Sequence, residues 1–99
     1  MPRAIVLDAR DNVATLIDPA AAGDIAALTG EAQGEITLRE AVPYGHKCAT
    51  RAIAPGDDIL KYGQVVGRAM ATIAAGQHVH VHNVESLRAR GDLESGRSS

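Results

Sequence analysis

Short apolar segments divided by turn residues dominate the hydrophobic pattern of this chain. Arg3 to Leu7 and Val13 to Ile17 are rich in β-branched and aliphatic residues, and they flank the turn cluster Ala9 to Asn12. This arrangement predicts an opening β-hairpin. From Glu35 to Glu40 polar and apolar residues alternate, which predicts a strand with one buried face.

The region between these segments has a different composition. Residues 18–30 are rich in alanine and glycine, and Asp24 precedes the apolar segment Ile25 to Leu28. Aspartate is a good N-cap, so a short helical turn is expected over Ile25 to Leu28. We therefore expect at most one short helix in the molecule.

A small pattern recurs further along the chain: an apolar residue, two others, a glycine, two more, and a residue able to be buried. Its copies are Val42/Gly45/Cys48, Ile53/Gly56/Ile59 and Ile73/Gly76/Val79. The segment Ala54 to Asp57 reads Ala-Pro-Gly-Asp, a strong turn signal, because proline presets φ and glycine admits a positive φ. Sharp turns at short intervals predict a mainly β fold with short, bent strands.

Composition limits what the chain can enclose. Its 99 residues fit one domain with a thin core, which another surface could complete. Phenylalanine and tryptophan are absent, so we expect packing to claim the two large rings, Tyr44 and Tyr62, and expect no deep catalytic pocket. Because the last residues are charged and poor in apolar side chains, we predict a domain over residues 1–85 and a mobile tail over 86–99.

The charge of the chain and its apolar runs limit the kinds of partner that we expect. The formal net charge is −2 and the basic residues form no stripe, which argues against a nucleic-acid partner. No apolar run approaches the ~18 residues of a membrane span, and the first residues lack the apolar region of a signal peptide. The single cysteine, Cys48, cannot form an internal disulfide, and we interpret it as a small core residue. We expect a cytoplasmic protein with no membrane partner.

The most informative segment is Gln77 to Glu85, because it holds His78, His80 and His82. On a strand these alternate side chains share a face about 6.5 to 7 Å apart and can converge on one ion. Imidazole ligates Zn, Fe, Ni or Mn, and a further ligand would come from elsewhere, with His46 the natural candidate. The same alternation also fits imidazoles that face solvent over a core of valines, and for His78 a surface position is favoured.

Gly45 to Cys48 forms a second cluster, in which a glycine lets the backbone approach a ligand. Lys47 could bind a carboxylate or sulfonate, or act as a base when desolvated; a solvated turn lysine is the alternative. Asn83 adjoins the histidines and could bond a substrate or support a ligand. Asp57 and Asp58 are interpreted as turn carboxylates.

Several of these segments together resemble a known family. They are Gly45-His46-Lys47, Asp57-Asp58-Ile59-Leu60-Lys61-Tyr62-Gly63, Val66-Gly67, Ile73-Ala74-Ala75-Gly76 and His78-Val79-His80-Val81-His82-Asn83. They resemble the SAF domain that opens altronate and galactarate dehydratases and forms the small subunit of sulfolactate sulfo-lyase. The likeness covers roughly Ala4 to Glu85 and implies a β-clip fold.

The resemblance also implies a chemistry. In that family a base removes the proton α to a carboxylate while hydroxide or sulfite leaves the β carbon, and a divalent metal, commonly Fe(II) or Mn(II), stabilises the enolate. It implies catalytic roles for His46, Lys47 and His80, substrate contacts from Asn83 and Lys47, and metal ligation by His80 and His82.

The fused members continue into a catalytic part, so we expect this chain to be a separate small subunit that needs a large catalytic lyase subunit. Its substrate would be a hydroxy acid, with dehydration of a sugar acid to a 2-keto-3-deoxy acid ahead of sulfolactate cleavage. A non-catalytic SAF module that binds a ligand or a partner remains the alternative from another class, because fold alone does not determine function.

Overall fold

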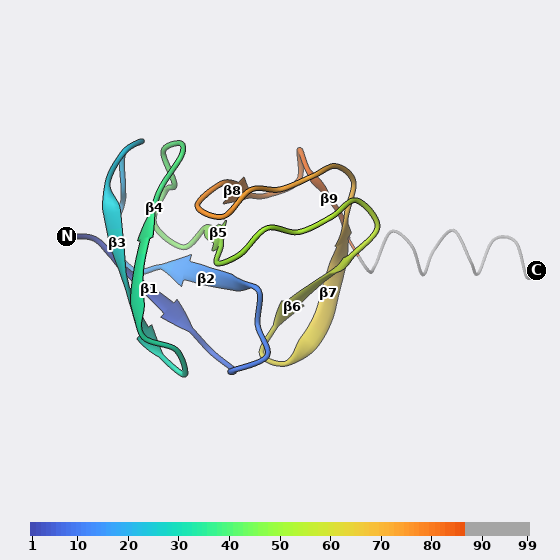
Figure 1. Cartoon of the computed structure of the whole chain (residues 1–99), viewed down its shortest axis with the longest axis horizontal. Coiled ribbons are helices and arrows are strands. Elements are labelled where there is room, and N and C mark those ends of the chain that lie inside the picture. The colour runs from blue at the N-terminus through green and yellow to red at the C-terminus, as the bar shows by residue number, and fades with distance from the viewer. Residues whose placement is uncertain (87–99) are drawn as a thin grey trace, which may run out of the picture.

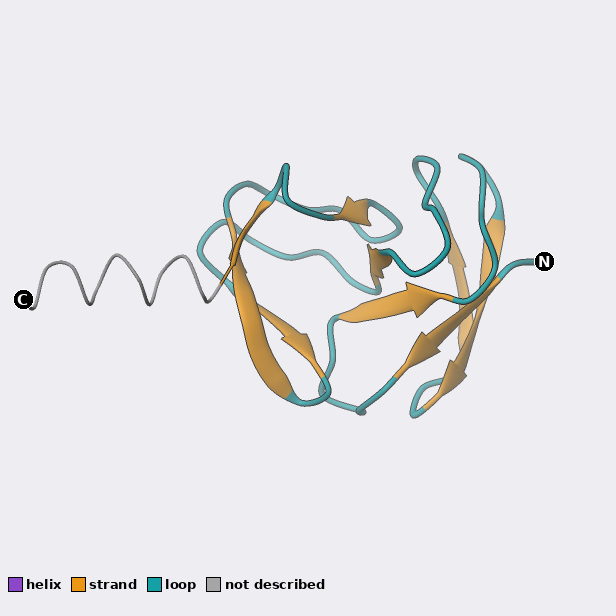
Figure 2. Ribbon diagram, turned by 180° about the vertical axis from the view of Figure 1, so that it is seen from behind, coloured by secondary structure: helices purple, strands orange, loops and turns teal. Residues whose placement is uncertain are grey.

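The computed structural model describes residues 1–86, and every regular element in that range is a β-strand (Figure 2). The strands are β1 (Arg3–Val6), β2 (Val13–Leu16), β3 (Ile25–Gly30), β4 (Gly34–Thr37), β5 (Lys47–Ala49), β6 (Asp58–Lys61), β7 (Gln64–Ala69), β8 (His78–Val79) and β9 (Val84–Ser86). The prediction of a mainly β fold is confirmed. Within the same range, no helix is long and apolar enough to cross a membrane.

The strands form two sheets. The larger has the order β4-β3-β1-β2-β5-β8, and the smaller has the order β6-β7-β9. Figure 1 shows β1, β3 and β4 at one end of the molecule, β6, β7 and β9 at the other, and β2, β5 and β8 between them. The predicted tail over 86–99 lies outside the described residues except for Ser86, which is the last residue of β9.

The first hairpin forms as predicted, but the predicted helical turn is wrong. β1 pairs with β2 in antiparallel fashion, whereas Ile25 to Leu28 belong to β3, which lies between β1 and β4. The Asp24 carboxylate accepts a hydrogen bond from the Ala21 N–H at 2.9 Å and closes the preceding turn instead of capping a helix. Pairing along both edges of β3 outweighs the modest helix propensity of its alanines.

The recurring glycine pattern marks four turns in residues 1–86. They are Ala21–Asp24, Pro43–His46, Ala54–Asp57 and Ala74–Gln77, and in each the last N–H donates to the first carbonyl at 3.0 or 3.1 Å. The third residue of each is a glycine with φ between +81° and +88°, as a sharp turn of this kind requires. The first turn was not predicted, because its flanking apolar positions, Ala20 and Ala26, are alanines that do not stand out in the hydrophobic pattern.

These turns organise the chain as an internal repeat. Isolated bridges join Ala20 to Val42 and Ile53 to Ile73. The β3–β4 hairpin lies between the first pair of turns and the β6–β7 hairpin between the second, and each half contributes to its own cluster of buried residues. β5 and β8 each follow the last turn of a half, and they pair with one another. Residues 46–49 and 77–80, distant in sequence, therefore lie side by side.

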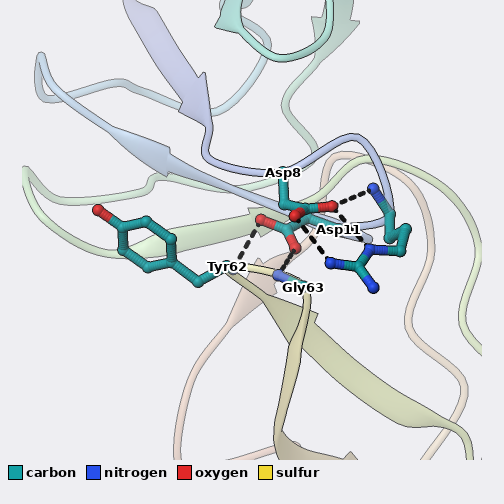
Figure 3. A network of polar contacts seen from close by, with 5 residues as sticks. Asp8, Asp11, Tyr62 and Gly63 are labelled. Carbon is teal, nitrogen blue, oxygen red and sulfur yellow. Dashed lines mark hydrogen bonds and ion pairs between the residues drawn. The ribbon is translucent and has the colours of Figure 1, made fainter.

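Asp11 and Asn12 attach the second hairpin to the first sheet. The Asn12 side chain donates to the Asp58 carbonyl and accepts from the Leu60 N–H, both at 2.8 Å. The Asp11 carboxylate accepts from the N–H groups of Tyr62 and Gly63 at 2.9 and 2.8 Å (Figure 3). Both anchoring residues are buried, so these bonds are shielded from water and hold the hairpin tip firmly.

The expectation that packing claims the two tyrosines is wrong. Tyr44 is 69% exposed and Tyr62 is 65% exposed. Each stands in a turn, where the backbone directs the side chain away from the core, and Figure 3 shows the Tyr62 ring extending away from the polar contacts around Asp11. The core is instead built from aliphatic side chains, alanines and Cys48.

Candidate functional site

The histidine-rich segment is a strand for only part of its predicted length. β8 ends at Val79, the chain turns over residues 80–83, and β9 begins at Val84. The Asn83 N–H closes this turn on the His80 carbonyl at 3.1 Å. The turn gathers the imidazoles: the ring of His78 lies 5.3 Å from that of His80 and 5.4 Å from that of His82, between centroids.

His46 joins the cluster from the turn that immediately precedes β5. Its Nδ1 lies 3.0 Å from Nε2 of His78, and its ring centroid is 4.4 Å from that of His80. The pairing of β5 with β8 brings these residues together. His46 therefore lies beside the histidine-rich segment, as expected of a further ligand from elsewhere in the chain. The surface position favoured for His78 is wrong, because its side chain is half-buried at the centre of the cluster.

Glu40 completes the cluster and was not predicted. Its Oε2 accepts a hydrogen bond from the His78 N–H at 3.2 Å. Two groups of three have donor atoms within 4.8 Å of one another: His46, His78 and His80, and Glu40, His78 and His82. His78 belongs to both groups, whereas His80 and His82 fall in different ones. Glu40 lies here because its segment packs against the segment of His78, 38 residues further along the chain. The residues next to Glu40 in the sequence do not indicate this position.

Burial and mutual repulsion keep two of the imidazoles neutral. Partial burial lowers the pKa of His78, the neighbouring imidazoles lower it further, and Glu40 opposes them. The pKa of His80 is lowered by the same two causes, with Lys47 adding to the repulsion. Both rings are therefore neutral at pH 7, the form in which an imidazole ligates a metal or accepts a proton.

Lys47 is half-buried and lies beside a surface hollow. Burial lowers the pKa of its ammonium, and the positive charge of Lys61 lowers it further. The hollow has a volume of about 220 Å³, and its walls are Lys47, Ile59, Val66, Val79, His80, Val81, Val84 and Ser86. His80 therefore links the histidine cluster to the hollow, and the predicted catalytic residues His46, Lys47 and His80 lie in one region.

Asn83 holds the loop that carries the histidines. It is 5% exposed, its Oδ1 accepts from the His80 N–H at 3.0 Å, and its Nδ2 donates to the His78 carbonyl at 2.8 Å. Both ends of the amide are thus engaged by the backbone of the loop. A supporting role is present in the structure, and a contact between Asn83 and a substrate stays a prediction.

The interpretation of Cys48 is confirmed, and the interpretation of turn carboxylates is confirmed for Asp57 but not for Asp58, which is the first residue of β6. Cys48 is fully buried, and burial raises the pKa of its thiol to about 11, which suits a core residue and not a nucleophile. Asp57 accepts a hydrogen bond from the Ala54 N–H at 3.2 Å within its turn. Neither residue contributes to the histidine cluster.

The fold and the site together define a small all-β module with an imidazole and carboxylate cluster beside a lysine. The sequence profile of the altronate/galactarate dehydratase SAF domain matches residues 2–87. The chain belongs to this family, as its resemblance predicted.

Curated relatives include both long and short proteins. Altronate dehydratase of Escherichia coli (strain K12) is 42% identical over 82 residues, which are 83% of this chain and 16% of that protein. Subunit alpha of (2R)-sulfolactate sulfo-lyase is 41% identical over 54 residues in Chromohalobacter salexigens, 54% of this chain and 57% of the subunit. The Paracoccus pantotrophus subunit is 36% identical over 53 residues, 54% of this chain and 79% of the subunit. The chain thus spans less than two thirds of the first two relatives.

Proposed function

We propose that this chain is the small SAF-domain subunit of a metal-dependent lyase that eliminates water from a sugar acid and gives a 2-keto-3-deoxy acid. The observation that supports it most directly is the convergence of His46, Lys47 and His80 at one place. An elimination α to a carboxylate needs a neutral base, a cation for the acid group and stabilisation of an enolate. These residue types supply the first two.

Each residue has a distinct task in this proposal. The Lys47 ammonium binds the substrate carboxylate, because it is a cation held at the rim of a mostly apolar hollow. The His80 imidazole takes the α proton, because the lowered pKa of His80 leaves a free nitrogen at neutral pH. His46, which lies beside it, is the alternative base. Asn83 keeps the loop in place through its bonds to the backbone at both ends.

The side chains of the cluster also suit a divalent metal. Imidazole and carboxylate ligands fit Fe(II) or Mn(II). The family resemblance implies His80 and His82 as the ligands, and His46 is then the imidazole left to take the proton. When bound, such an ion acts as a Lewis acid toward the carboxylate and the developing enolate.

A large catalytic partner is part of the proposal. The walls of the hollow are mostly aliphatic and offer few hydrogen bonds to a polyhydroxylated acid, so other groups must recognise the hydroxyls. The matching region is only 16% of the length of altronate dehydratase from Escherichia coli. We therefore propose that the groups that select the substrate belong to a large lyase subunit.

The test is reconstitution of this chain with a lyase subunit and measurement of 2-keto acid formation from sugar acids. His80→Ala should reduce turnover at least ~100-fold as the loss of a proton-transfer group, and Lys47→Met at least ~10-fold as the loss of a charged hydrogen bond. Lys61→Met is the matched control, because Lys61 lies near Lys47 but outside the hollow, and should retain activity. Full turnover in both site variants would remove these residues from the mechanism.

A second candidate is the small subunit of sulfolactate sulfo-lyase. It is favoured by the match to 79% of a relative that is itself a separate subunit. The same reconstituted complex distinguishes the two, since sulfolactate cleavage releases sulfite and dehydration does not. A third reading, a non-catalytic binding module, requires that the isolated chain bind the acid and that no complex form a 2-keto acid.

A further inference from the structure

We infer that this chain, without a partner, binds one divalent transition-metal ion through His46, His78 and His80. The inference rests on the proposed function in placing the ion at the same site. It adds a ligand set that replaces the expected pair, His80 and His82, and it gives His46 and His80 the task of holding the ion in place of proton transfer. It also adds independence from any other subunit.

Two of the ring nitrogens already lie at the spacing of two ligands on one ion. Nδ1 of His46 and Nε2 of His78 face one another at 3.0 Å. Two nitrogens that each lie about 2.1 Å from one ion are roughly 3.0 to 3.4 Å apart, for right-angled and tetrahedral coordination respectively. The pair is thus already near the spacing of two ligands on one ion, and a metal can replace the hydrogen bond between them.

His80 provides the third ligand. A donor nitrogen of His80 lies within 4.8 Å of those of His46 and His78, so the three side chains can be ligands of the same ion. Three imidazoles that leave one position open are a common arrangement for zinc and related metals. Because His80 also lines the hollow beside Lys47, the open position lies near the group proposed to bind the substrate carboxylate.

Hydrogen bonds hold the backbone of His78 and His80 in place before any ion binds. Asn83 is buried and bonds the backbone of both His78 and His80, and Glu40 accepts from the His78 N–H. Metal sites depend on such support, because it fixes ligand direction before the ion arrives. The Glu40 carboxylate also places an acidic side chain beside the three rings, which favours a cation.

The second group, Glu40, His78 and His82, competes for the same ion because it shares His78. We assign the ion to the three imidazoles for two reasons. Glu40 is already engaged by the His78 N–H, and His82 is exposed whereas His46 is half-buried. Less exposed ligands lose less side-chain entropy when they are fixed on an ion.

The experiment is a Co²⁺ titration of the full-length, metal-free chain in the absence of any partner, followed by visible absorption. We expect one equivalent to bind, with the absorption of a low-coordinate nitrogen site that Zn²⁺ then displaces. His46→Ala, His80→Ala and His78→Gln should each weaken binding at least ~10-fold. Lys61→Met is the control and should bind as wild type. Circular dichroism of each variant identifies any that fails to fold, and the two remaining histidine variants then decide.

Three outcomes would overturn the inference: no binding at one equivalent, binding unchanged in His46→Ala, or binding abolished by His82→Ala but not by His46→Ala, which moves the ion to the Glu40 group. Lyase turnover by the reconstituted complex separates this result from the proposed function. Metal binding without turnover leaves the inference standing and contradicts the function, whereas turnover by a complex whose small subunit binds no metal does the reverse.

Discussion

At the scale of single residues, Tyr62 occupies a backbone conformation that a tyrosine adopts only under constraint. Its φ is +60°, in the left-handed region that costs an L-residue roughly 1 to 2 kcal/mol. The buried Asp11 carboxylate stabilises this conformation through the N–H groups of Tyr62 and Gly63 (Figure 3). The ring itself is largely exposed, so packing does not account for the strain.

Replacing this tyrosine with glycine should stabilise the protein. Tyr62→Gly removes the strain and keeps the N–H that Asp11 accepts, so we expect the free energy of unfolding to rise by about 0.5 to 1 kcal/mol. Tyr44→Gly is the matched control: Tyr44 is equally exposed but has no positive φ, so glycine there should destabilise by about 0.5 to 1 kcal/mol. Chemical denaturation measures both, and a loss of stability in Tyr62→Gly would contradict the account of strain.

Cys48 provides a second prediction at this scale. Burial raises the pKa of its thiol to about 11, so at pH 8 the group is protonated as well as inaccessible. A thiol reagent should leave the folded protein unmodified and react with one equivalent after addition of denaturant, as absorbance of the released chromophore would show. Rapid modification of the native protein, with circular dichroism unchanged, would show that the thiol is neither buried nor protonated.

At the scale of elements, the local sequence predicted correctly those elements that depend only on adjacent residues. Ala54-Pro55-Gly56-Asp57 predicted its turn because φ preferences of adjacent residues decide it. β3 was mistaken for a helix because its identity depends on pairing with β1 and β4, which no window of the sequence displays. The turn at Gly23 was missed for the related reason that alanines are apolar enough to pack but do not stand out in a hydrophobic pattern.

The repeat allows two equivalent turns to be compared. Gly56 and Gly76 have nearly the same φ, +85° and +84°, but a Cβ at Gly56 would meet open space, whereas one at Gly76 would collide with the Thr37 carbonyl oxygen. Gly56→Ala should therefore cost about 1 to 2 kcal/mol from the backbone alone. Gly76→Ala should cost at least about 1 kcal/mol more, because the clash adds to the strain. Equal losses of stability on denaturation would indicate that the second turn relaxes freely.

At the scale of the whole molecule, the candidate site exists because the two halves of the repeat meet through β5 and β8. The three histidines of one segment were visible in the sequence, and His46 was chosen because a metal needs further ligands. Glu40 and the central place of His78 were not predictable, since they follow from how three distant segments pack. The turn at residues 80–83 was also hidden, because Val81, the flanking Val79 and Val84, and the alternating histidines imitate a continuous strand.

The proposed partner surface is also a property of the whole molecule. The hollow beside Lys47 is lined by aliphatic residues, including the 75% exposed Val81, and a large subunit that covers it would bury this side chain. Val81→Asp should then weaken association at least ~10-fold, because it replaces an aliphatic contact with a charge that the interface must desolvate. Ile25→Asp is the matched control, because Ile25 is 43% exposed on β3 in the other half of the repeat. Sedimentation or calorimetry with the lyase subunit measures both affinities. If Val81→Asp binds as tightly as wild type while Ile25→Asp does not, the partner covers the first half of the molecule and the hollow stays open to solvent.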